Sequence, residues 1–71
     1  MPCVLPDGTV APVAKRILSV TSKERSAEEI ADETGAPLFR VRSSIRELIE
    51  AGLLEDRGER YRITEKGKGK I

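Results

Sequence analysis

The sequence has no histidine, no tryptophan and one cysteine, Cys3, and these shortages exclude several kinds of functional site. Zinc sites draw on several Cys and His side chains, and the Cys–His and Ser–His–Asp catalytic groups require a histidine. One thiol cannot form an intramolecular disulfide, so we expect a reducing cytoplasm, with an intermolecular disulfide or a redox sensor as the alternative role of Cys3. We therefore expect no catalytic centre, no metal and no cofactor.

Long hydrophobic runs are also missing. No apolar run approaches the roughly 20 residues of a membrane-spanning helix, and no signal peptide is visible. Seventy-one residues make one small domain, whose core is too small to hold a substrate pocket in addition to a scaffold. The sequence therefore argues against an enzyme and against a membrane protein, and favours a small cytoplasmic binding domain.

Charge is nearly balanced overall but is unevenly distributed along the chain. The net charge is +1, yet residues 1–35 hold four basic and six acidic side chains, whereas residues 36–71 hold nine basic and six acidic ones. The second half therefore carries +3 and the first half −2. Such an asymmetry can orient a protein on an anionic surface even when the total charge is small.

The stretch from residue 26 to residue 54 organises the chain, and it begins with a predicted helix. Ser26 followed by Glu29 forms a capping box, in which each side chain accepts a hydrogen bond from the other residue's backbone N–H. Gly35 suits the left-handed conformation that ends a helix, and Pro37 cannot continue one. We therefore expect a first helix from Ser26 to a tight turn around Gly35.

A second helix is predicted from Leu38 to Ala51. Its residues at the 3.6-residue period share one face: Val41, Ile45, Leu48 and Gly52. The two helices and their tight turn constitute a helix-turn-helix. The opposite face of the second helix carries Phe39, Ser43 and Arg46, flanked by Arg40 and Arg42. A face with three guanidinium groups suits the DNA major groove, although a solvated helix face can have the same composition.

The flanking segments are predicted to complete a small α+β domain. Residues 1–9 are expected to form an arm, and a helix runs from Val10 to about Thr21, with Thr9 as a possible cap. A polar connection follows over residues 22–25. After the helix-turn-helix, residues 53–57 and 60–64 alternate as two strands of a hairpin whose turn, Gly58-Glu59, fits type II′. Residues 68–71 form a basic tail, and glycines in 65–71 should fray any helix there.

One core is expected to join these elements. Its predicted members are Val13, Ile17, Ile30, Ala36, Val41, Ile45, Leu48, Leu53, Tyr61 and Ile63. The order of helix, helix, turn, helix and two-stranded hairpin, over residues 10–67, is that of a small winged helix.

The residues themselves resemble a known family. The stretch from Ser26 to Gly67 is similar to the helix-turn-helix and wing of MarR-like and ArsR-like transcriptional regulators, most specifically at LIEAGLL (48–54) and YRITEKG (61–67). The resemblance implies that residues 38–51 are a recognition helix whose groove-facing residues are Phe39, Arg40, Arg42, Ser43 and Arg46. It also implies that Arg57 and Arg60 are wing residues that reach the backbone or minor groove, and we expect Lys66 to be a further phosphate contact.

Two functions remain open from the sequence. The first is a DNA-binding regulator that reads a short site on double-stranded DNA. The second is a protein interaction module, in which Leu38 and an exposed Phe39 contact a partner, since aromatic residues are enriched at interfaces. Because these regulators usually continue into a long dimerisation helix that is not seen here, we expect a monomer or a weak homodimer.

Overall fold

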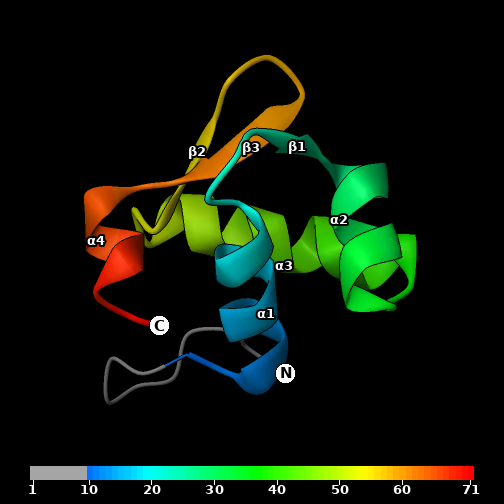
Figure 1. Cartoon of the computed structure of the whole chain (residues 1–71), viewed down its shortest axis with the longest axis horizontal. Coiled ribbons are helices and arrows are strands. Elements are labelled where there is room, and N and C mark those ends of the chain that lie inside the picture. Colours follow the sequence, from blue (N-terminus) through cyan, green and yellow to red (C-terminus); the bar gives the residue numbers. More distant parts are fainter. Residues whose placement is uncertain (1–9) are drawn as a thin grey trace.

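The structure is a computed structural model that describes residues 10–71, so the expected arm, the Thr9 cap and Cys3 lie outside the described residues (Figure 1). Its elements in chain order are α1 (Pro12–Val20), β1 (Arg25–Ser26), α2 (Ala27–Thr34), α3 (Leu38–Glu50), β2 (Leu54–Asp56), β3 (Arg60–Ile63) and α4 (Glu65–Lys68). The three longer helices pack together, and the sheet lies across them. The predicted small α+β fold of winged-helix type is confirmed.

Both ends of α2 have the predicted structure. The Ser26 hydroxyl accepts a hydrogen bond from the Glu29 N–H at 3.2 Å, and the Glu29 carboxylate accepts one from the Ser26 N–H at 2.8 Å. Gly35 takes a φ of +75° and donates its N–H to the Ala31 carbonyl. The helix therefore begins and ends where the capping box and the glycine predicted.

The sheet has one more strand than the predicted two-stranded hairpin. Its order is β1-β3-β2, all antiparallel, with Arg25 opposite Tyr61 and Leu54 opposite Ile63. The sequence analysis placed Arg25 in a polar connection and Ser26 at the cap of the following helix, because two residues show no strand periodicity of their own. This strand exists only because β3, 35 positions away in the sequence, supplies its hydrogen-bonding partner.

The turn of the hairpin also differs from the prediction. Both central residues have a positive φ, 73° at Gly58 and 65° at Glu59. This combination defines a type I′ turn, so the expected type II′ is wrong. The Asp56 carboxylate accepts hydrogen bonds from the N–H groups of Gly58 and Glu59 at 3.1 and 3.2 Å. These bonds stabilise the left-handed backbone conformation at Glu59, which is not a glycine.

A single core joins the helices to the sheet. Seven of its predicted members are buried, and the other three, Val13, Ala36 and Tyr61, pack against it partly exposed. The sequence analysis did not place Val10, Ala14, Leu18, Ala27 and Leu54 on its core list, but they are buried as well. The core thus holds α1, α2, α3 and the sheet in one fixed arrangement. The outward face of α3 and the hairpin turn remain exposed to solvent.

The segment after the sheet forms a short helix where fraying was expected. The Thr64 hydroxyl caps α4 by accepting the Gly67 N–H at 3.1 Å. Gly67 is buried, and a Cβ atom there would collide with the Leu53 carbonyl oxygen. Close packing therefore requires glycine at this position. From the sequence alone, this glycine was recognised only as a residue that disfavours a helix.

Candidate nucleic-acid interface

The outward face of α3 carries the residues that the sequence analysis selected. Four positions of α3 are buried: Val41, Ser44, Ile45 and Leu48. The five predicted groove-facing residues are all exposed: Phe39, Arg40, Arg42, Ser43 and Arg46. Phe39 stands out because 75% of its surface is accessible, the largest fraction for a large hydrophobic residue in the described chain. Leu38, by contrast, is partly buried against the core.

These residues do not form one compact patch. Each residue turns an α-helix by about 100°, so Arg40 and Arg42 lie about 160° apart around the axis. Arg42 and Arg46, one turn apart, share the flank that faces α2 and the hairpin, whereas Arg40 lies on the other flank. Phe39 and Ser43 lie between the flanks. A duplex lying along the outward face of α3 would meet an arginine on each side.

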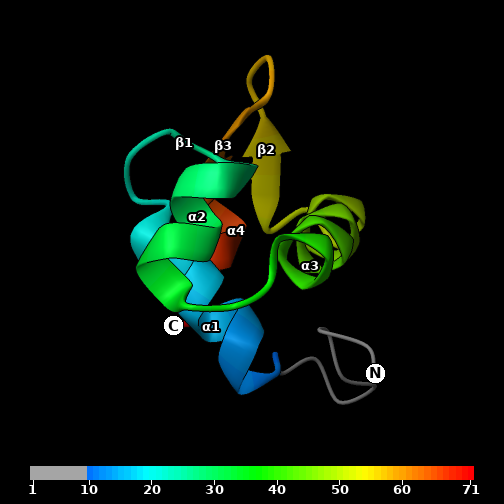
Figure 2. The ribbon, with the colours of Figure 1, turned by 90° about the vertical axis from the view of Figure 1, so that its right-hand side faces the viewer.

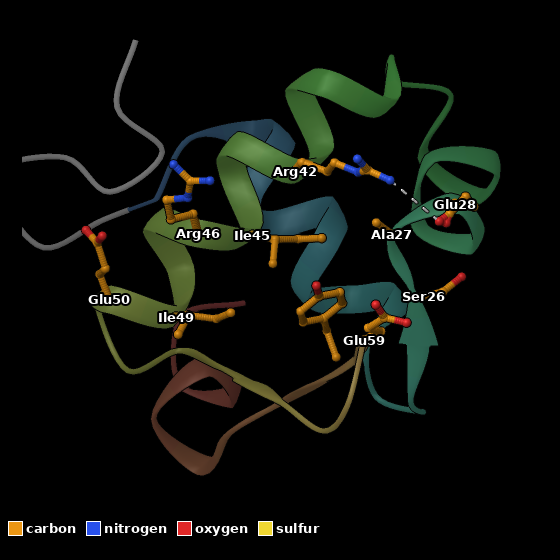
Figure 3. A pocket seen from close by; sticks show the side chains of 10 residues that line it. Ser26, Ala27, Glu28, Arg42, Ile45, Arg46, Ile49, Glu50 and Glu59 are labelled. Carbon is orange, nitrogen blue, oxygen red and sulfur yellow. Dashed lines mark ion pairs between the residues drawn. The ribbon is translucent and has the colours of Figure 1, made fainter.

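An open groove of about 710 Å³ runs along the flank of α3 that bears Arg42 and Arg46 (Figure 3). Its walls are α3, the start of α2 and the hairpin, and it is lined by Ser26, Ala27, Glu28, Arg42, Ile45, Arg46, Ile49, Glu50, Glu59 and Tyr61. Figure 2, which looks nearly along α3, shows the hairpin rising beside this helix. The groove therefore lies where helix-turn-helix and wing meet, and its lining carries both charges.

Three arginines of this region are held by carboxylates. Arg42 reaches across the groove to Glu28 of α2 at 4.0 Å, as Figure 3 shows. Arg57, beside the hairpin turn, contacts Glu24 at 3.2 Å and Glu55 at 3.1 Å. All three side chains of the Arg57 cluster are at least 39% exposed, so these pairs remain accessible to solvent and ligands.

Arg60 makes two contacts to the segment that leads into α2. Its guanidinium contacts the Glu29 carboxylate at 3.2 Å and donates a hydrogen bond to the Glu24 carbonyl oxygen at 2.9 Å. It therefore ties β3 to the segment that leads into α2. Arg57 and Arg60, predicted as wing contacts, thus also support the wing from within the domain. Sequence reasoning missed this role because Glu24 and Glu29 are distant from the hairpin in the sequence.

The remaining predicted site residues have different surroundings. Arg40 and Arg46 make no ion pair among the described residues, and in Figure 3 Arg46 projects away from the Arg42–Glu28 pair. Lys66 lies over Gly52, just after the end of α3, at the end of β3 that is remote from the hairpin turn. A cation there complements the negative end of the helix dipole of α3. Lys66 is therefore separated in space from the other candidate DNA-binding residues, which lie on the outward face of α3 and beside the hairpin turn.

Glu29 has a perturbed acidity. The pKa of its carboxyl is lowered, first by the hydrogen bond from the Ser26 N–H and then by the nearby Arg60 guanidinium, while partial desolvation acts in the opposite direction. The carboxylate is thus stabilised in its charged form. It serves the cap of α2 and the anchoring of the wing at once.

Residues 10–71 contain neither a cluster of metal ligands nor a membrane-spanning helix. No group of three or more Cys, Asp or Glu side chains there is arranged to hold a metal ion. No helix in the same residues is long and apolar enough to cross a membrane.

Comparison with known proteins supplies the family. Residues 16–68, more than half of the chain, match the family described as the HemN C-terminal domain. The chain belongs to the HemN C-terminal domain family. No curated protein matches this chain.

A solved structure resembles this HemN C-terminal domain in fold. An O-methyltransferase family protein from Burkholderia thailandensis superimposes with a TM-score of 0.70 and 25% sequence identity, over 79% of this chain and 17% of that one. This chain thus spans about a sixth of the length of that protein. The predicted resemblance is confirmed for the winged-helix fold, whereas the family is that of HemN C-terminal domains.

Proposed function

We propose that this domain binds double-stranded DNA as a small transcriptional regulator of the kind that its resemblance to MarR-like and ArsR-like proteins implies. In this proposal α3 enters the major groove, and the hairpin acts as a wing on the backbone or in the minor groove. The major groove admits an α-helix, and Arg can contact both phosphates and guanine edges there. The domain would act by binding and not by catalysis.

The observation that carries the proposal is the outward face of α3. It projects from the core, and its exposed arginines Arg40 and Arg46 have no carboxylate partner among the described residues. Ser43 lies between them and can donate to a base or a phosphate. Arg42 is paired only at 4.0 Å, in an exposed contact that contributes little to stability, so it is available to a ligand.

A second candidate function is protein docking, and Phe39 favours it. A Phe with 75% of its surface exposed is a candidate interface anchor, and both comparisons concern parts of larger proteins. In the DNA proposal, Phe39 would instead contact a thymine methyl group. Phe39→Ala separates the two functions: loss of a protein partner with unchanged DNA affinity would favour docking.

Substitutions on α3 test the proposal directly. Arg42→Ala and Arg46→Ala should each weaken binding to a preferred duplex by about 1–3 kcal/mol and reduce the preference for that sequence, if each reads a base. Arg16→Ala, which removes the same charge from the exposed side of α1, is the matched control and should have a smaller effect. Fluorescence anisotropy with labelled duplexes measures all three. Equal effects of the three variants would contradict a specific role for α3.

A further inference from the structure

We infer that Glu24, Glu28 and Glu29 act as internal competitors of DNA phosphates, because they occupy arginines of the helix-turn-helix and wing. This inference rests on the proposed function. The three carboxylates come from one stretch of six residues, whereas their partners Arg42, Arg57 and Arg60 come from α3 and the hairpin. One short segment therefore neutralises cations from both elements that would contact a duplex.

The placement of this segment explains how it reaches both elements. Residues 24–29 include β1, which pairs with β3, and the start of α2, which forms a wall of the groove. Glu24 and Glu29 therefore face the hairpin, while Glu28 faces α3 across the groove. A phosphate approaching Arg57 or Arg60 meets a carboxylate that is already bound at 3.2 Å.

The pairs are weak enough to be exchanged. Each involves side chains that are at least 39% exposed, and such pairs typically contribute an energy that corresponds to about 1.4- to fivefold in an equilibrium constant. A duplex that binds through these arginines must break the ion pairs, and each broken pair reduces the binding constant by about this factor. Wild-type affinity should accordingly be lower than the number of arginines suggests, and fewer phosphates should be neutralised.

The test replaces each carboxylate by its neutral isostere. Glu24→Gln, Glu29→Gln and Glu28→Gln remove the charge and keep the side-chain length, and Gln at position 29 can still complete the capping box. Asp32→Asn is the matched control, since Asp32 is exposed on α2 and makes no ion pair among the described residues. Circular dichroism during thermal unfolding checks that every variant is folded.

Affinity for a duplex and its salt dependence are then measured together. We expect Glu29→Gln to tighten binding about two- to fivefold. Glu24→Gln should do so less because Arg57 keeps its contact with Glu55 at 3.1 Å, and Glu28→Gln should do so less because its pair is longer. The triple variant should gain about five- to tenfold. For each arginine freed, the slope of log K against log salt should steepen by about one unit. A merely structural role of the carboxylates would not steepen this slope.

The outcomes separate this inference from the proposed function. Wild-type binding with variants no tighter than Asp32→Asn, and with unchanged slopes, would overturn the inference and leave the proposed function intact. If no variant binds any duplex, the proposed function fails and the inference fails with it.

Discussion

Arg42 and Arg60 show how one residue type acquires different roles within one small domain. Both were selected from the sequence, Arg42 by its place on a helix face and Arg60 by its place beside a turn. Arg60 is fixed by a carboxylate and a carbonyl oxygen, whereas Arg42 has one distant carboxylate. Periodicity predicted which side chains are exposed, but it could not predict these partners, because they depend on the packing of α2 against α3 and on the pairing of β1 with β3.

Ile45 provides a residue-scale test of that packing. It is 4% exposed, belongs to the core and also lines the groove. Ile45→Ala should lower the free energy of unfolding by about 2–5 kcal/mol, as other large-to-small core changes do. Urea denaturation measures the loss. Phe39→Ala on the exposed face is the control and should change stability by no more than about 0.5 kcal/mol. Similar losses for both variants would mean that α3 is rotated about its axis.

At the scale of elements, the helices were easier to predict than the sheet. The limits of α2 follow from local signals, a capping box and a glycine with a positive φ. In contrast, β1 contains only Arg25 and Ser26, and no local pattern distinguishes it from a connection. The short helix α4 was expected to fray because Gly67 was judged only by its low helix propensity. In the structure, Gly67 is needed because it packs closely against the Leu53 carbonyl.

Gly67 and Gly69 form a matched pair that tests the packing of α4. A Cβ at Gly67 would collide with the Leu53 backbone, whereas a Cβ at Gly69 would lie 3.5 Å from the Lys66 carbonyl oxygen, in ordinary contact. Gly67→Ala should therefore destabilise the domain by about 1–3 kcal/mol. Gly69→Ala should be neutral or stabilise by up to about 1 kcal/mol, since φ at Gly69 is −72°. Thermal unfolding compares the two, and equal effects would argue against close packing at Gly67.

The start of α2 should make stability depend on pH. Because the folded state lowers the pKa of Glu29 below its ordinary value of 4.5, the ionised carboxylate stabilises the fold above that value. This contribution is lost as the pH falls through the lowered pKa of the folded state. The stability difference between wild type and Glu29→Gln should therefore shrink on acidification from about pH 7, as measured by urea denaturation. A difference independent of pH would contradict the role of the Glu29 charge.

At the scale of the whole molecule, fold and function have different support. The order of elements predicted the winged-helix fold, and the match to HemN C-terminal domains and the superposition on an O-methyltransferase family protein agree with it. Function cannot be read from the fold alone, because one fold hosts many activities. Function depends on the surface of α3 and the hairpin, where several arginines are paired with carboxylates. The net charge of the whole chain is only +1.

The most direct test of DNA binding is a salt series on the wild-type protein with a duplex. Neutralising several phosphates by arginine makes log K fall linearly with log salt, with a slope of about −0.9 per phosphate. The candidate phosphate contacts are Arg40, Arg57, Arg60 and Lys66. Because Arg57 and Arg60 are already paired with carboxylates, we predict a slope between about −2 and −4. Failure to bind any duplex more tightly than about 10⁻⁴ M at physiological salt, the weak limit of non-specific binding, would contradict the account.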